Sequence, residues 1–222
     1  MTFTLSDWMN MFMFIVSLSV LVLKPSPPIL KYFPIYFLCG FVVGLLEEYM
    51  QSKRIYNTGV ANAYGIADFT FVYLVLRSFM TNPRIRKIII FVIVIVDLFA
   101  TINLIFIQKK VGFNPINFTI ESLICVLLCI YYYNELFQKT EAPSLYRLPA
   151  FWITTAIFFN TILSFPIWAL LSFMQEMTKS NQASFKIIIR NIATIWYIIT
   201  IMTYTLYSIG FLCRIKIRKF TL

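Results

Sequence analysis

Residues 86–107 read RKIIIFVIVIVDLFATINLIFI, and this stretch decides the class of fold. After its first two residues it is predominantly apolar over about 20 positions, the length that a helix needs to cross the hydrocarbon core of a bilayer. Its one acid is Asp97, close to the middle. The stretch therefore predicts a transmembrane helix that carries a carboxyl group at membrane depth.

The whole chain has the composition of a membrane protein. Of its 222 residues, 60% are hydrophobic and 13% are charged, and the mean hydropathy is +0.80. This is about half the usual share of charged residues, too few to cover a water-soluble domain of this length. Such high hydrophobicity also excludes a disordered chain. We therefore expect an all-α polytopic membrane protein.

Six other segments share the length and composition of a transmembrane helix. Polar or Pro-containing segments separate them, the longest being residues 175–184, and Pro166 is expected to kink the sixth span. The seven predicted spans are residues 5–23, 30–50, 58–80, 86–107, 116–137, 148–174 and 185–213. No loop is long enough to fold alone, so residues 1–222 are expected to form a single transmembrane domain.

The first span could be mistaken for a signal peptide. Residues 1–7 contain no Lys or Arg, and no small-residue cleavage pattern precedes Lys24. A secretory signal peptide normally has a basic N-terminal region and a small-residue cleavage site. We therefore expect the first span to be a retained helix.

The distribution of basic residues predicts the orientation, because cytoplasmic loops carry an excess of Lys and Arg. With the N-terminus outside, 12 of the 19 basic residues fall at the inner ends of the spans and 7 at the outer ends. The clusters at residues 84–87 and 214–219 account for most of the difference. The sequence therefore predicts an outside N-terminus and a cytoplasmic C-terminus. The net charge of +10 is then explained by the loops rather than by binding of nucleic acid.

The composition argues against most enzyme classes. The chain contains 0 histidines, which removes most zinc hydrolases, haem proteins with His ligands and Ser-His-Asp enzymes. The acids near the middle of the third and fourth predicted spans, Asp68 and Asp97, lack the Tyr-Asp and Gly-x-Gly-Asp contexts of intramembrane aspartyl proteases. Residues 192–212 contain no lysine for a retinal Schiff base. The cysteines lie in apolar stretches, where packing is their expected role; they are Cys39, Cys125, Cys129 and Cys213. We predict no catalytic residues, no metal site, no cofactor and no enzyme activity.

Two carboxyl groups lie near the middle of adjacent predicted helices. Asp68 is 15 positions before Pro83, and Asp97 is 14 positions after it. At about 1.5 Å per residue these positions have nearly the same depth in antiparallel helices. No Lys or Arg shares that depth, and both desolvation and mutual repulsion disfavour charged carboxylates. One interpretation is a pair that holds a proton or a cation.

The other interpretation is structural, with each carboxyl bonded to polar side chains on other helices. The candidate partners are Asn62, Asn103, Asn160, Thr200, Thr203 and Thr205. Small residues one helical turn apart, such as Ala61 and Gly65, lie on the same face as Asp68. Such a face allows close helix approach, so Asp68 is expected to point into the bundle.

Further polar residues lie toward the outer ends of the predicted spans. They suggest an outer-facing polar pocket, or ordinary solvation at the membrane interface. The members of this predicted pocket are Glu47, Glu48, Asn62, Tyr64, Glu121 and Arg190. Nearby, Gly40 and Gly44 form a G-x-x-x-G pattern. This pattern is typical of close helix packing, within the bundle or between protomers of a homo-oligomer.

Four stretches carry a family resemblance. They are LLEEY at residues 45–49, FVYLVLRSF at 71–79, LPAFWITTA at 148–156 and YSIGFLC at 207–213. In these stretches the chain resembles an uncharacterised family of seven-transmembrane-helix proteins that is common in Bacteroidota and often encoded near sensor histidine kinase genes. The resemblance implies a multi-pass inner-membrane protein that is itself a sensory module acting on a separate kinase. It implies no site residue.

These features lead to one main functional hypothesis and three alternatives. The main hypothesis is a signalling, sensory or regulatory module that works in the bilayer with a separate cytoplasmic or membrane partner. It rests on a polar interior without a catalytic set. The alternatives are a small proton-coupled transporter or ion pathway, an accessory membrane protein of a defence or secretion system, and a lipid-acting membrane enzyme.

Overall fold

The computed structural model describes residues 5–22, 27–107, 115–138, 145–177 and 182–217. This part of the chain forms seven α-helices and no strand, which confirms the all-α prediction for it. The helices are α1 Leu5–Val22, α2 Phe33–Ser52, α3 Thr58–Phe79, α4 Pro83–Ile102, α5 Pro115–Phe137, α6 Pro149–Met177 and α7 Gln182–Ile217.

Six helical segments are long and apolar enough to cross a membrane, judged by length and composition among the described residues. They are Pro28–Ser52, Thr58–Phe79, Pro83–Phe106, Pro115–Phe137, Pro149–Leu171 and Thr194–Cys213. A shorter apolar helix, Asp7–Val22, precedes them. The protein thus has the form of a multi-pass membrane protein.

Some predicted helix ends are wrong. Helix α4 begins at Pro83 rather than at residue 86, because the Asn82 side chain caps it by accepting the backbone N–H of Arg84 at 2.9 Å and proline suits the first helical position. The predicted loop at 175–184 is also too long, since α6 continues to Met177 and α7 begins at Gln182. Hydropathy locates the apolar part of a helix, whereas a helix extends into polar sequence beyond the bilayer.

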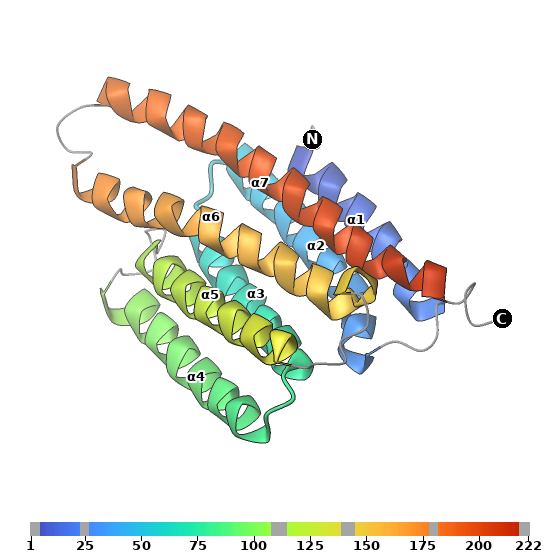
Figure 1. Ribbon diagram of the computed structural model, residues 1–222. Helices are drawn as coiled ribbons and strands as arrows, with labels where there is room; N and C mark the ends of the chain where they lie inside the picture. The colour runs from blue at the N-terminus through green and yellow to red at the C-terminus, as the bar shows by residue number, and fades with distance from the viewer. Residues whose placement is uncertain (1–4, 23–26, 108–114, 139–144, 178–181, 218–222) are drawn as a thin grey trace.

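Helix α7 shows this extension most clearly. It has 36 residues, about 54 Å at 1.5 Å per residue, against a hydrocarbon core of about 30 Å. Figure 1 shows the start of α7 and the end of α6 extending beyond the neighbouring helices. Pro166 lies inside α6, and the helix continues on both sides of it.

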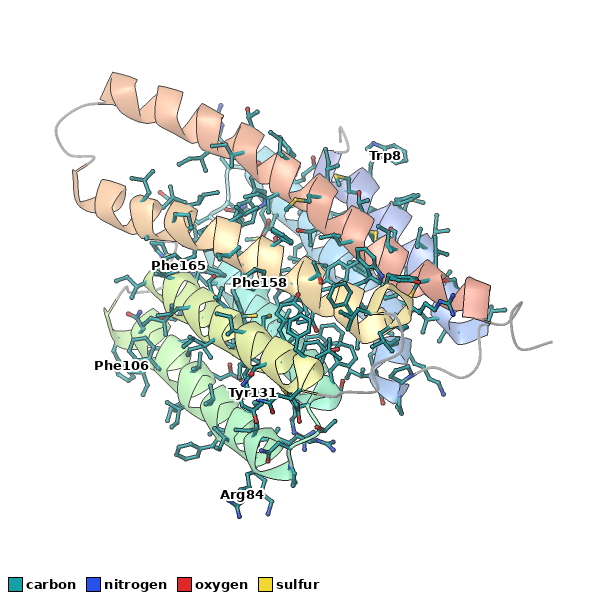
Figure 2. All side chains as sticks on the ribbon, in the orientation of Figure 1. Trp8, Arg84, Phe106, Tyr131, Phe158 and Phe165 are labelled. Carbon is teal, nitrogen blue, oxygen red and sulfur yellow. The ribbon has the colours of Figure 1, made fainter. Side chains whose placement is uncertain are left out.

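The helices form an antiparallel bundle in which α3 has a central place (Figure 1). Helix α3 contacts α2, α4, α5 and α6, while α6 lies between α5 and α7. Helix α1 packs against both α2 and α7, so it is an integral part of the bundle. Figure 2 shows Trp8 and Phe106 pointing away from the bundle, where their side chains are 57% and 72% exposed. An exposed apolar surface of this kind is suited to contact with lipid.

A cluster of aromatic rings joins α2, α3 and α7. Phe33 is the centre of this cluster, with ring centroids 5.2 Å from Phe71, 5.7 Å from Tyr207 and 5.1 Å from Phe211. Phe33 and Phe211 are fully buried. Edge-to-face and tilted ring contacts add to the burial of apolar area. The cluster therefore fixes the spacing of these three helices beside the cavity described next.

A hydrogen-bonded clamp joins the end of α5 to the turn between α3 and α4. The Glu135 carboxylate accepts the backbone N–H of Thr81 at 3.0 Å and that of Asn82 at 2.9 Å. The Thr81 hydroxyl donates to the same carboxylate. This clamp holds α5 in place against the α3–α4 turn.

Candidate functional site

The main internal feature is a cavity of about 260 Å³ between α1, α2, α3, α6 and α7. Its polar lining residues are Asn10, Glu47, Asp68, Asn160, Thr161, Thr200 and Thr203. Its aromatic lining residues are Tyr36, Tyr64, Phe69, Trp196, Tyr204 and Tyr207. Tyr36 and Glu47 are 11 residues apart on α2, so the cavity extends over about 16 Å of the bundle at 1.5 Å per residue.

Asp68 lies at the middle of α3 and opens onto this cavity. The Tyr36 hydroxyl on α2 donates to Asp68 Oδ1 at 2.6 Å. The Tyr36 ring stacks on Phe71 with centroids 4.4 Å apart, which fixes the direction of its hydroxyl. The prediction that Asp68 points into the bundle is therefore confirmed.

Helix α1 supplies a second polar wall. The Tyr204 hydroxyl on α7 donates to Asn10 Oδ1 at 2.5 Å. Asp7 is buried beside α2, where a Cβ built on Gly44 would lie 2.5 Å from Asp7 Oδ1. A Cβ on Gly40 would lie 2.7 Å from the Tyr64 hydroxyl oxygen. The two glycines of the G-x-x-x-G pattern thus face groups inside the bundle.

The cavity also contains a polar atom without a partner. Thr203 is 3% exposed, and among the described residues nothing hydrogen-bonds to its Oγ1. A buried hydroxyl without a partner costs about 1–3 kcal/mol. Such a group in the wall of a cavity has the chemistry to bind water or a ligand.

Asp97 does not form a pair with Asp68. The Thr70 hydroxyl on α3 lies 2.9 Å from Asp97 Oδ2 and 3.1 Å from Oδ1. Positions 68 and 70 face opposite sides of an α-helix, because two residues correspond to about 200°. The two carboxyl groups therefore lie on different sides of α3, and the shared-pair interpretation is wrong.

The predicted outer pocket is divided in the same way. Glu47 and Tyr64 line the cavity with Asp68, whereas Asn62 and Glu121 line a separate space of about 10 Å³ between α3, α4 and α5. Glu121 is 1% exposed, and its Oε1 has no hydrogen-bond partner among the described residues.

The last two members of the predicted pocket are Glu48 and Arg190. Glu48 is partly buried and is not among the lining residues of the cavity. Arg190 lies on α7, but its side chain is outside the described residues. The polar residues toward this end of the bundle therefore do not form one pocket.

The side chains predicted to bond to the two aspartates lie in different places. Asn160, Thr200 and Thr203 line the same cavity as Asp68. Asn103 instead donates to Asn117 Oδ1 at 2.9 Å, and Thr205 is exposed and donates to the backbone of Ile201. The hydroxyl groups that contact the carboxyls belong to Tyr36 and Thr70, which the sequence did not single out.

Four further polar or aromatic residues were not predicted: Asn10, Trp196 and Tyr204 line the cavity, and Asp7 lies beside Gly44. A signal was present for α1, since Asp7, Asn10 and Ser17 recur at helical spacing in an apolar segment. No comparable sequence signal marks Tyr36 and Tyr204, because aromatic residues are frequent throughout this chain and most of them pack in the core or face lipid.

The groups described around this cavity are carboxyls, amides, hydroxyls and aromatic rings, which have the chemistry to bind a ligand. Among the described residues, no group of three or more His, Cys, Asp or Glu side chains is placed to hold a metal ion. The described Cys125 and Cys129 are buried free thiols on α5.

Comparisons with protein-family models, with curated proteins and with solved structures found no match. The function must therefore be inferred from the cavity itself.

Tyr36→Phe is expected to destabilise the protein by about 1–3 kcal/mol, because the Asp68 carboxyl loses a close hydroxyl donor while the aromatic stack stays. Tyr32→Phe is the control, since Tyr32 is exposed near the start of α2. Denaturant unfolding in detergent micelles measures both. Equal stability of the two variants would show that the bond to Asp68 contributes nothing.

Proposed function

We propose that the protein is a membrane signalling or regulatory module whose stimulus acts at the Asp68 cavity. The observation that carries this proposal is a polar, aromatic-lined cavity inside the bundle, bounded by five helices. Occupation of such a cavity favours one packing of the helices over another, and a ligand shifts the population by its difference in affinity for the two packings. A change in the protonation of Asp68 would act in the same way.

The topology of this module is part of the proposal. We propose seven crossings, with α1 as the first, an outside N-terminus and a cytoplasmic C-terminus in the inner membrane. The close packing of α1 on α2 and α7 supports its inclusion, and the distribution of Lys and Arg supports the orientation. Figure 2 labels Arg84 near the start of α4, and in the proposed orientation this end of the bundle faces the cytoplasm. A signal then leaves through a basic surface toward a separate kinase or other membrane partner.

We also propose that the chain belongs to the Bacteroidota seven-helix family. The stretches at residues 45–49 and 207–213 support this. Glu47 from the first stretch and Tyr207 from the second both line the Asp68 cavity. In a family that signals through this cavity, these stretches would contain residues of the site.

The alternative is a proton-coupled carrier. It is favoured by the position of Asp68 at mid-length of a helix and at the wall of a cavity, since carboxyl groups at membrane depth are typical of proton relays. Flux into liposomes with and without a pH gradient distinguishes the two. Uptake that depends on the gradient and on Asp68 would replace the signalling proposal.

A distance measurement tests the signalling proposal. Spin labels are placed at Lys31 and Arg84, two exposed positions at the same end of the bundle, after the exposed Cys39 and the partly exposed Cys213 are replaced by alanine. Asp68→Asn mimics the protonated carboxyl and is expected to shift the distribution of distances. Asp97→Asn is the matched control and is expected to leave it unchanged. One distribution shared by all three proteins would overturn the proposal.

A further inference from the structure

Three residues at the Asp68 site line two spaces at once. Tyr36, Tyr64 and Asp68 line the internal cavity, and they also line a groove of about 400 Å³ between α2 and α3. Ile35 and Tyr32 line the groove and are 60% and 57% exposed, so the groove lies on the outer surface of the bundle. The three residues therefore form the partition between the bundle interior and a surface that faces lipid.

The two spaces have different chemistry. Apart from these three residues, the groove is lined mainly by apolar side chains, namely Ile29, Ile35, Ala67, Phe71 and Leu74. The cavity carries carboxyl, amide and hydroxyl groups, including the unpartnered Thr203 hydroxyl. A molecule that fits both needs an apolar part and a polar part joined at the position of Asp68.

The charged groups of the cavity determine whether the polar part of such a ligand is a cation or an anion. Its ionisable lining groups include the carboxyls of Glu47 and Asp68, and none of the lining residues that the structure describes is Lys or Arg. Aromatic side chains line the same cavity as these acids, including Tyr64 on α3 and Trp196 and Tyr204 on α7. Aromatic faces attract ammonium groups, and desolvated sites strengthen this attraction. An anion at this position would meet two acids and no described cation.

We propose that the stimulus of the signalling module proposed above is an amphiphilic organic ammonium dissolved in the bilayer. Its ammonium head occupies the cavity against the Asp68 carboxylate, and its apolar tail occupies the α2–α3 groove. Because Tyr36, Tyr64 and Asp68 separate the two spaces, the ligand enters sideways from lipid by displacing the Tyr64 side chain. The Tyr36 hydroxyl, already 2.6 Å from Asp68 Oδ1, keeps the carboxylate in position for the head.

A binding series in nanodiscs of neutral lipid tests the ligand class. The probes are octyltrimethylammonium, tetramethylammonium, octyl sulfate and octanol, and the signal is the fluorescence of Trp196, which lines the cavity. Octyltrimethylammonium is expected to bind saturably and about tenfold or more tightly than tetramethylammonium. Saturable binding of octyl sulfate or octanol with similar affinity would overturn the proposal. Trp196→Phe identifies the part of the signal that comes from the cavity.

Variants then test the two halves of the site. Asp68→Asn is expected to weaken octyltrimethylammonium binding by about tenfold or more, while Asp97→Asn, on the other side of α3, is expected to bind normally. Ala67→Phe fills the groove without a place in the cavity, so it is expected to remove the advantage of the octyl chain and to leave tetramethylammonium binding unchanged. Normal binding to Asp68→Asn, or an unchanged chain-length preference in Ala67→Phe, contradicts the proposal. If Asp68→Asn does not fold, the probe series and Ala67→Phe decide.

The outcome separates this inference from the signalling role. Ammonium binding that leaves the Lys31–Arg84 distances unchanged supports the ligand class and rejects the signalling role. A distance shift in Asp68→Asn together with no saturable ammonium binding rejects the ligand class and supports the signalling role.

Discussion

Gly65→Leu is expected to destabilise the protein by about 3 kcal/mol, because it overpacks the α3–α5 contact. Gly65 is buried on the face of α3 that meets α5. A Cβ at this position would collide with the Cε1 and Cζ atoms of the Phe118 ring. A leucine adds three further carbon atoms to the same space.

The Phe118 ring has little freedom to move away. It stacks on Trp168 with centroids 4.9 Å apart and contacts Phe69 at 6.1 Å. Trp168 in turn meets Trp196 at 4.8 Å. A displacement of Phe118 would therefore spread through the tryptophans to the wall of the Asp68 cavity, and close-packed interiors transmit such strain.

Denaturant unfolding in micelles measures the loss, with four further variants as controls: Gly59→Ala, Gly65→Ala, Phe118→Leu and the double variant of the last two. Gly59→Ala is on the same helix, and a Cβ there meets nothing within 4 Å, so its stability is expected to stay equal or to rise slightly, by up to about 1 kcal/mol. The double variant Gly65→Ala Phe118→Leu is expected to lose less unfolding free energy than the two single variants lose together. The reason is that a leucine at position 118 is smaller than the phenylalanine and leaves room for the Cβ of an alanine at position 65. Additive losses would show that the ring is not the obstacle.

The fold class follows from composition, and the helix ends do not. Residues 86–107 are apolar enough to be placed in a membrane without further information. The last three residues of α6 and the first three of α7, QEM and QAS, are largely polar, so hydropathy assigned them to a loop although the backbone is helical. These residues continue the backbone hydrogen bonding of a helix that has already formed, and the mean hydropathy of a segment does not report on this.

The depth of Asp68 and Asp97 and the inward direction of Asp68 could be predicted, whereas the direction of Asp97 relative to Asp68 could not. Counting residues from Pro83 fixes the height of each carboxyl along its helix at about 1.5 Å per residue. The rotation of each helix depends on which neighbours it packs against, and α3 has four of them. Asp68 consequently meets Tyr36 on α2, while Asp97 meets Thr70 from the other side. For the same reason Tyr64 lines the Asp68 cavity, whereas Asn62 lines the small space beside α4 and α5.

Two buried polar residues one turn apart on α5 are expected to respond oppositely to replacement by leucine. Asn117 Oδ1 accepts from Asn103 at 2.9 Å, and Asn117 Nδ2 donates to the Ala100 carbonyl at 3.3 Å. Glu121 is 1% exposed, and its Oε1 has no partner among the described residues. Asn117→Leu therefore removes bonds that offset the burial of polar atoms, whereas Glu121→Leu removes a burial cost that no bond to Oε1 offsets.

Asn117→Leu is expected to lose about 1–3 kcal/mol of unfolding free energy, and Glu121→Leu is expected to gain about 1–3 kcal/mol. Unfolding of both variants in the same micelles as the wild type measures the two signs. A gain in Glu121→Leu means that the acid is retained at the expense of stability, as functional residues often are. A loss in Glu121→Leu as large as that in Asn117→Leu would instead mean that the carboxyl is bound to water in the 10 Å³ space that it shares with Asn62 and that it stabilises the bundle.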